Sequence, residues 1–171
     1  MENLPTDLPR SCAIMGVSGS GKTTIGAAVS AKLDWVLLEA DDFHPQANID
    51  KMSQGHPLND KDRWPWLEAI HQAMAEHLSQ GRSVVVVCSA LKESYRKVIQ
   101  GEFELSWFYL KGSYELIFRR MQARAHFMKP EMLQSQFDTL EEPEDAVILD
   151  IGEQKEELIN TIVSTLTSNQ A

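Results

Sequence analysis

The 171-residue sequence predicts an α/β fold: a doubly wound, parallel, five-stranded sheet with flanking helices. Short apolar runs alternate with longer segments of helical spacing, which favours parallel strands joined by right-handed crossovers. Residues 83–88, SVVVVC, are β-branched without polar alternation, as is typical of a strand buried on both faces. The first apolar run also leads directly into a glycine-rich loop. Together these observations define the expected fold class.

The first half of the chain contains the expected elements in alternating order. Residues 11–16, SCAIMG, are a short apolar run and predict a strand. Residues 21–33 predict a helix, because Ile25, Val29 and Leu33 share one side. The next expected elements are a strand at 35–39 (WVLLE), a short helix from His44-Pro45 to near Gly55, and an amphipathic helix at 66–79 that ends before Gly81.

The second half continues the alternation. After the strand at 83–88, the expected strands are 105–110 (LSWFYL) and 146–149 (AVIL), and the expected helices are 92–100, 114–124, 131–140 and 154–166. Residues 1–10, which include Pro5 and Pro9, are expected to be a loose lead-in. The length and pattern predict a single domain over 11–168.

Charge is distributed unevenly along the chain. The formal net charge is −9, yet residues 1–130 hold 15 acidic and 15 basic side chains. Residues 131–171 hold 10 acidic and one basic side chain, whereas the short segment 111–129 is cationic. Such a small cationic segment argues against a nucleic-acid partner, which would need a broad basic face. It fits a site for a small polyanion, although a solvated helix face is the alternative.

The two cysteines, Cys12 and Cys88, are too few for a disulfide framework or a zinc site. They indicate buried free thiols in a reducing compartment. The sequence contains no visible secretory signal and no apolar run of the ~18 to 20 residues that would span a bilayer. We therefore expect a cytoplasmic protein without a membrane partner.

The glycine-rich segment GVSGSGKT at 16–23 matches the phosphate-binding motif G-x-x-x-x-G-K-[ST] between a strand and a helix. Its backbone N–H groups and the helix N-terminus can cradle phosphate, and its spacing disfavours a dinucleotide fold. Lys22 is expected at the β- and γ-phosphates, and Thr23 is expected to ligate Mg²⁺. The predicted ATP-binding residues are Gly16, Val17, Ser18, Gly19, Ser20, Gly21, Lys22, Thr23 and Thr24.

A phosphate-binding loop alone does not specify the reaction. The sequence has no N-K-x-D guanine clamp, which argues against a GTPase. Asp150, at the end of AVILD, resembles a Walker B aspartate, but we interpret it as a decoy because it lies so late in the chain. Asp41, just after the strand at 35–39, is better placed to orient an acceptor hydroxyl and hold magnesium through water. Its neighbour Asp42 is the alternative.

Three further segments follow the phosphate loop in a recognisable order. They read LEADDFHPQANIDKMSQGHPLNDKDRWPWL at 38–67, CSALKESYR at 88–96 and HFMKPEMLQSQFDTLEEP at 126–143. Together with GVSGSGKT they resemble gluconokinase, the ATP-dependent kinase of D-gluconate, over about 12–165. The resemblance implies an adenylate-kinase-like P-loop kinase fold with a helical lid around 120–137. It also implies ATP and Mg²⁺, the product 6-phospho-D-gluconate and a homodimer.

Candidate site residues surround the loop in this interpretation. Arg120 and Arg124 share a helix face and are expected to stabilise the transferring phosphoryl group, with Lys22 and Asp41 as the other catalytic residues. One residue fewer than the family pattern separates Arg124 from His126. The expected gluconate-binding residues are Asp41, His44, Lys51, Arg63 and Arg96. Arg63 is the first choice for the carboxylate, and a surface salt bridge with Asp60 or Asp62 is its alternative.

Two other functions remain compatible with the sequence. Another small-acid kinase, such as shikimate kinase, would share the fold class. A non-catalytic P-loop protein could use its nucleotide state to control partner binding. The cationic segment and the polar segment after the second strand favour the kinase.

Overall fold

The computed structural model describes residues 8–123 and 129–168 and contains a five-stranded sheet of order β2-β3-β1-β4-β5. All four neighbouring pairs are parallel, as predicted. The strands are β1 (Ser11–Met15), β2 (Val36–Glu39), β3 (Val84–Val87), β4 (Leu105–Lys111) and β5 (Val147–Asp150).

The helices lie close to their predicted positions. They are α1 (Lys22–Leu33), α2 (Gln46–Ser53), α3 (Asp60–Ser79), α4 (Glu93–Gln100), α5 (Tyr114–Ala123), α6 (Pro130–Thr139) and α7 (Lys155–Ser168), with a 3₁₀ turn, η1, at Ala40–Phe43. Within the described ranges, no helix combines the length and apolar character needed to cross a membrane.

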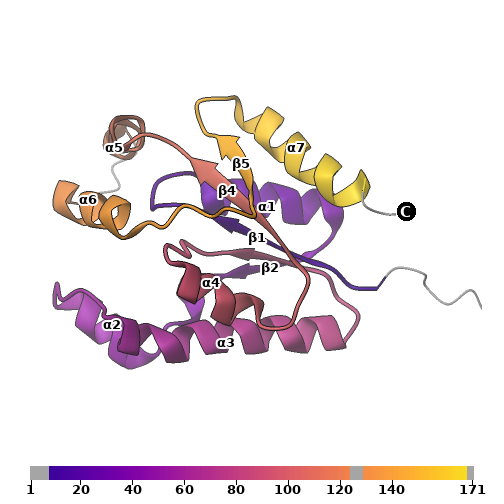
Figure 1. Cartoon of the computed structure of the whole chain (residues 1–171), viewed down its shortest axis with the longest axis horizontal. Helices are drawn as coiled ribbons and strands as arrows, with labels where there is room; N and C mark the ends of the chain where they lie inside the picture. Colours follow the sequence, from indigo (N-terminus) through magenta and orange to yellow (C-terminus); the bar gives the residue numbers. More distant parts are fainter. Residues whose placement is uncertain (1–7, 124–128, 169–171) are drawn as a thin grey trace, which may run out of the picture.

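Side chains of β1 alternate between two cores on opposite faces of the sheet. Cys12 and Ile14 pack in the core that α1, α5, α6 and α7 help to form. Ala13 and Met15 pack in the other core, with side chains from α3 and α4. Figure 1 shows α3 and α4 on one face of the sheet and α1 and α7 on the other. The predicted doubly wound fold is therefore confirmed.

Helix α3 is longer than its predicted extent, 66–79, because it begins at Asp60. A capping box starts it: the Asn59 side chain accepts from the Asp62 N–H, and the Asp62 carboxylate accepts from the Asn59 N–H. These bonds satisfy N–H groups that a helix start otherwise leaves unpaired. Pro65 lies inside the helix and does not end it. The extra turn places Arg63 on a helix.

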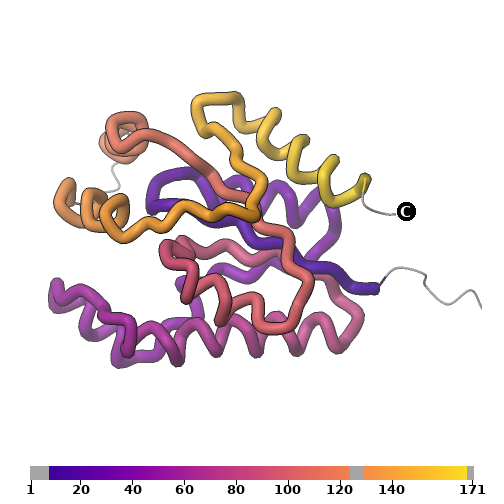
Figure 2. The backbone as a smooth tube through the Cα atoms, in the orientation of Figure 1, coloured from indigo at the N-terminus to yellow at the C-terminus, as the bar shows by residue number. Residues whose placement is uncertain are grey.

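The site lies at the carboxyl edge of the sheet, where ligands of doubly wound folds bind. Strand β1 is central, between β3 and β4, so its loop has neighbours on both sides. Figure 2 shows the beginning and end of the described chain at one side of the molecule, with α2 and α6 at the opposite side.

Candidate active site

The phosphate-binding loop joins β1 to α1, and two of its glycines are required by close contacts. A Cβ on Gly16 would lie 2.8 Å from the Leu110 carbonyl oxygen. Gly19 has a φ of +82°, and a Cβ there would lie 2.7 Å from the Met121 side chain. Larger residues would therefore push the loop away from β4 and α5.

Lys22 and Ser20 place polar groups inside this loop. The Lys22 Nζ donates to the Val17 carbonyl oxygen at 3.0 Å. Burial lowers the pKa of Lys22, while the nearby groups Cys88, Asp41 and Glu39 act in the opposite direction. The Ser20 hydroxyl is buried and has no hydrogen-bond partner among residues 8–123 and 129–168. An unpaired buried hydroxyl in an anion-binding loop fits a site that receives a ligand oxygen.

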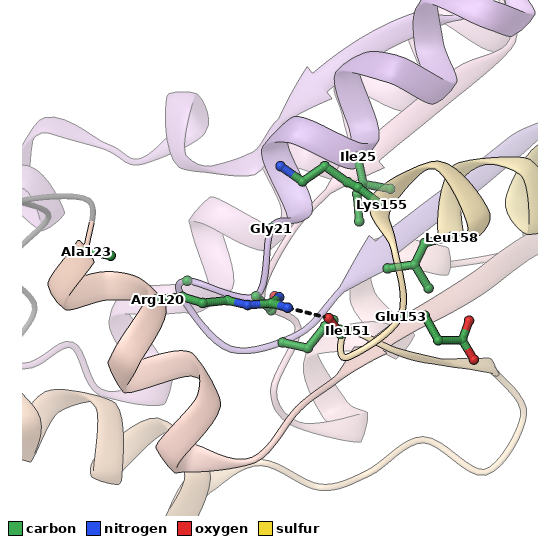
Figure 3. Close-up of a pocket in the computed structure, with 10 residues that line it drawn as sticks. Gly21, Ile25, Arg120, Ala123, Ile151, Glu153, Lys155 and Leu158 are labelled. Atoms are coloured by element: carbon green, nitrogen blue, oxygen red, sulfur yellow. Dashed lines mark hydrogen bonds between the residues drawn. The ribbon is translucent and has the colours of Figure 1, made fainter.

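A cavity of about 290 Å³ adjoins the loop. Its lining comes from the loop, α1, α5, the turn after β5 and the start of α7: Gly19, Ser20, Gly21, Ile25, Arg120, Ala123, Ile151, Glu153, Lys155 and Leu158. Arg120 extends across the cavity and donates to the Ile151 carbonyl oxygen at 2.6 Å (Figure 3). The structure therefore brings Arg120 beside the phosphate loop. Arg124, its predicted partner, lies outside the described residues.

Glu39 is a site residue that the sequence analysis missed. It ends β2, and its carboxylate accepts a hydrogen bond from the Thr23 hydroxyl at 2.9 Å. Burial raises the pKa of Glu39, the Thr23 hydrogen bond lowers it, and the charge of Asp41 raises it. The available signal was an acidic residue at the carboxyl end of the apolar strand that follows the phosphate loop and its helix in the sequence.

Asp41 lies in η1, directly after β2. The charge of Asp41 raises the pKa of Lys22, of Glu39 and of His44. The charge of Asp42 raises the pKa of Glu39. Asp41 therefore lies near enough to act on Lys22, Glu39 and His44, and its role as the carboxylate at the acceptor hydroxyl stays a prediction. A hydrogen bond anchors η1 to α3, because the buried Trp66 indole donates to the Ala40 carbonyl oxygen at 2.7 Å.

His44 directly follows η1 and packs against α3. Its ring stacks on Trp66, with centroids 4.2 Å apart and planes inclined by 12°. Its Nδ1 lies 3.3 Å from the Asn48 amide nitrogen, which also donates to the Asp62 carbonyl oxygen. Burial lowers the pKa of His44, Asp41 raises it and Arg63 lowers it. Asp41 and Arg63, two of the predicted site residues, are thus near enough to act on the His44 imidazole.

Arg63 belongs to a network that joins α3 to α4. It donates to the Tyr95 hydroxyl at 3.1 Å and lies 3.6 Å from Asp60, so the alternative salt bridge with Asp60 is present. The Tyr95 hydroxyl donates to Asp60, and Lys92 approaches the same carboxylate at 3.1 Å. Hydrogen bonds from Tyr95 and then Lys92 lower the pKa of Asp60. The sequence analysis identified neither Tyr95 nor Lys92 as part of the site.

Two predicted substrate ligands are occupied by contacts within the protein. Lys51 pairs with Asp62 at 2.6 Å and so ties α2 to α3. Arg96 is 8% exposed and donates to the carbonyl oxygens of Ala90 and Glu141 at 2.7 and 2.9 Å. Arg96 thus joins two backbone segments in this structure, and its contact with substrate stays a prediction.

Asp150, Cys12 and Cys88 were not expected to take part in catalysis. Asp150 ends the edge strand β5 and accepts a hydrogen bond from the Gly152 N–H at 2.8 Å. Cys12 and Cys88 are buried free thiols, and burial raises the pKa of each to about 12. Neither thiol has the low pKa of a nucleophilic cysteine.

Known proteins are similar to this chain over most of its length. A family model described as an AAA domain matches residues 12–143. The chain is 47% identical over 145 residues to the thermosensitive gluconokinase of Escherichia coli, covering 81% of this chain and 78% of that protein. It is 40% identical over 174 residues to a gluconokinase of Arabidopsis thaliana, covering 92% of each.

Solved structures agree with these relatives. An unliganded sugar kinase from Janibacter is 41% identical, with a TM-score of 0.85 over 93% of this chain and 95% of that one. A gluconokinase from Sinorhizobium meliloti is 37% identical, with a TM-score of 0.79 over 96% and 99%. With relatives this similar over most of its length, the chain belongs to the gluconokinase family.

Proposed function

We propose that this protein transfers the γ-phosphoryl group of ATP to D-gluconate and releases ADP and 6-phospho-D-gluconate. The observation that carries the proposal is that the phosphate-binding motif contacts the strand end next to the predicted acceptor-binding residues: the Thr23 hydroxyl donates to Glu39 at the end of β2. Asp41 and His44 follow Glu39 in and directly after η1, and Arg63 lies in α3, which packs against η1. The predicted phosphate-binding and acceptor-binding groups thus lie next to each other. The family relatives that are named gluconokinases support gluconate as the acceptor.

The nucleotide is assigned to the phosphate loop and the adjoining cavity. The loop N–H groups and Lys22 would bind the β- and γ-phosphates, and the buried Ser20 hydroxyl would gain a partner there. Arg120 would lie along the polyphosphate and neutralise charge that develops during transfer. We extend the proposal to a lid around 120–137, in which Arg124 would join Arg120.

Magnesium is part of the proposal because the donor set fits it. Thr23 and Glu39 present a hydroxyl and a carboxylate 2.9 Å apart, both hard oxygen donors. No cluster of three His, Cys, Asp or Glu residues suited to a metal occurs in the described ranges. This is the pattern for an ion held largely by phosphate oxygens and water, with one or two protein oxygens. When bound, Mg²⁺ would neutralise phosphate charge.

The acceptor is oriented by complementary charges. Arg63 would bind the gluconate carboxylate, aided by Tyr95, which accepts from its guanidinium. His44 would contact the hydroxyl groups, and the buried Asn48 amide beside it would hold the imidazole in place. Asp41 would accept a hydrogen bond from the reacting hydroxyl and take its proton as the new P–O bond forms.

Two finer parts of the proposal concern the protein as a whole. The family resemblance implies a homodimer, which light scattering on a size-exclusion column would test. A cytoplasmic location is consistent with two free thiols, because thiols stay reduced there. Fractionation of the source cells would test the location.

The experiment for the main proposal is an ADP-release assay with a panel of acceptors. D-gluconate should support turnover in the presence of Mg²⁺, and EDTA should remove it. Two other acceptors serve as controls. Shikimate is a cyclic carboxylate, and D-glucose is a sugar without a carboxylate. Equal rates with shikimate would refute gluconate specificity, and no acceptor-dependent ADP release would refute the kinase.

A further inference from the structure

Helix α6 contacts the phosphate loop through one glutamine. The Gln136 Oε1 accepts from the Ser18 N–H at 2.8 Å, and its Nε2 donates to the Ser18 hydroxyl at 2.9 Å. Ser18 is the third residue of GVSGSGKT and is half-buried. One side-chain amide therefore holds both the backbone and the side chain of a loop residue 118 positions away.

Two bonds to one residue restrict its orientation more than either bond does alone. A carboxamide can accept and donate from the same end, so it fits an N–H group and a hydroxyl that lie side by side. The direction of the Ser18 peptide helps to set the entry into the loop, whose N–H groups point at the phosphates. Gln136 therefore acts on the geometry of the anion-binding backbone.

The helix that carries Gln136 is itself braced on both sides of that residue. Leu133 is fully buried in the core shared with α1 and α7. Beyond the helix, Glu141 donates from its N–H to the Leu91 carbonyl oxygen at 2.7 Å. The Glu141 carboxylate accepts from the Glu93 N–H at 3.0 Å. A braced helix can impose a position on the loop, whereas a free side chain could only follow it.

We propose that Gln136 is a positioning residue for phosphoryl transfer, which holds Ser18 so that the phosphate loop presents the γ-phosphate in line with the acceptor. The proposal rests on the proposed kinase function, but it concerns the loop and makes no claim about the acceptor. Misplacement of a reacting group by about 1 Å can cost about a hundredfold in rate. Loss of the clamp should therefore appear mainly in kcat.

The test uses two substitutions at this position and two matched controls. Gln136→Met keeps the length of the side chain but removes both hydrogen bonds. Gln136→Glu can accept from both Ser18 groups, because the hydroxyl can rotate to donate, but it adds a negative charge beside the phosphates. The controls are Gln134→Met and Gln134→Glu, since exposed Gln134 lies on the same helix and donates to Asp138 at 2.9 Å.

Steady-state kinetics and an ATP titration without acceptor are measured for each variant. Gln136→Met should lower kcat at least about tenfold, with the ATP Kd changed by less than about threefold. Gln136→Glu should weaken ATP binding at least about tenfold, because like charges repel across a short distance. Both Gln134 controls should resemble wild type. Ser18→Ala combined with Gln136→Met should be no worse than Gln136→Met alone, because both changes break one pair.

Three outcomes would overturn the proposal. Tighter ATP binding by Gln136→Met with unchanged kcat would make the contact a latch that nucleotide must open. Wild-type kcat in Gln136→Met would show that the clamp is dispensable. An unchanged ATP Kd in Gln136→Glu would show that Gln136 does not lie beside the bound phosphates. This ATP titration needs no acceptor, so it tests Gln136 even if wild type binds ATP but does not phosphorylate gluconate, a result that would refute only the proposed function.

Discussion

Replacing Trp66 with phenylalanine removes a single hydrogen bond beneath the predicted base. The Trp66 indole is 7% exposed and donates to the carbonyl oxygen of Ala40, which is 1% exposed. Phenylalanine leaves that buried acceptor unpaired, which costs about 1–3 kcal/mol, and its smaller ring adds about 1 kcal/mol of lost packing. The free energy of unfolding should therefore fall by about 2–4 kcal/mol. For a chain of this size, Tm should fall by roughly 5–15 °C.

The same substitution should reduce catalysis at a temperature where the variant is still folded. Asp41 directly follows Ala40, and the Trp66 ring also stacks on His44 at 4.2 Å. A shift of this turn would misplace both groups, so kcat should fall about tenfold to a hundredfold. ATP affinity should stay unchanged, because Trp66 packs in the core opposite to the nucleotide cavity. The assay is ADP release at saturating gluconate and ATP, well below the Tm of the variant.

Trp107→Phe is the matched control. Trp107 is 9% exposed, and its indole donates to the Gln100 side chain at 3.0 Å, so the substitution deletes the same kind of bond. This variant should lose stability yet keep wild-type kcat. The reasoning would be refuted if Trp66→Phe retained full kcat, or if both variants lost kcat equally.

Three further outcomes follow from the site. Lys22→Met should reduce kcat to background while a thermal melt shows an intact fold, because Lys22 faces the phosphate-binding loop and not either core. Asp41→Asn should lower kcat at least ~10²-fold with nearly unchanged ATP binding, as for positioned acid–base groups. Asp42→Asn should cost far less, and steady-state kinetics on the pair would expose a register error if the order were reversed. Arg63→Gln should raise the gluconate KM at least about tenfold with little change in the ATP KM, because a carboxylate would lose its charged partner. Unchanged gluconate saturation would reassign Arg63 to its contact with Asp60.

Local sequence signals predicted most of the fold because they agreed with the tertiary arrangement. The β-branched run became the buried strand β3, and the glycine-rich loop stands where its motif requires. Helix α3 begins at Asp60 and not at the predicted residue 66, and Pro65 lies inside it although proline is usually a helix boundary. The capping box of Asn59 and Asp62 outweighed that signal, and it was visible as a polar pair three residues apart.

The site was less predictable where its contacts join distant segments. Asp41 and His44 lie within one short stretch of sequence, so their proximity could be inferred. Arg96 could not be assigned in this way, because one of its partners is a backbone carbonyl 45 residues later. Every residue has a backbone carbonyl, so the sequence does not indicate which carbonyl oxygen a side chain will contact. Tyr95 was equally hidden, since its role depends on α4 packing against α3.

The sheet acts as a partition between the two sets of side chains described above. Trp66 and Tyr95, which support the proposed acceptor side, pack on one face, whereas Ile25 and Leu158 of the proposed nucleotide cavity pack on the other. A library aimed at other sugar acids can therefore be confined to 40–66 and 92–95. ATP affinity then serves as an internal control. A library member with wild-type ATP affinity has kept the structure of the nucleotide-side face, so a change in its rates with different acceptors can be assigned to the substituted face.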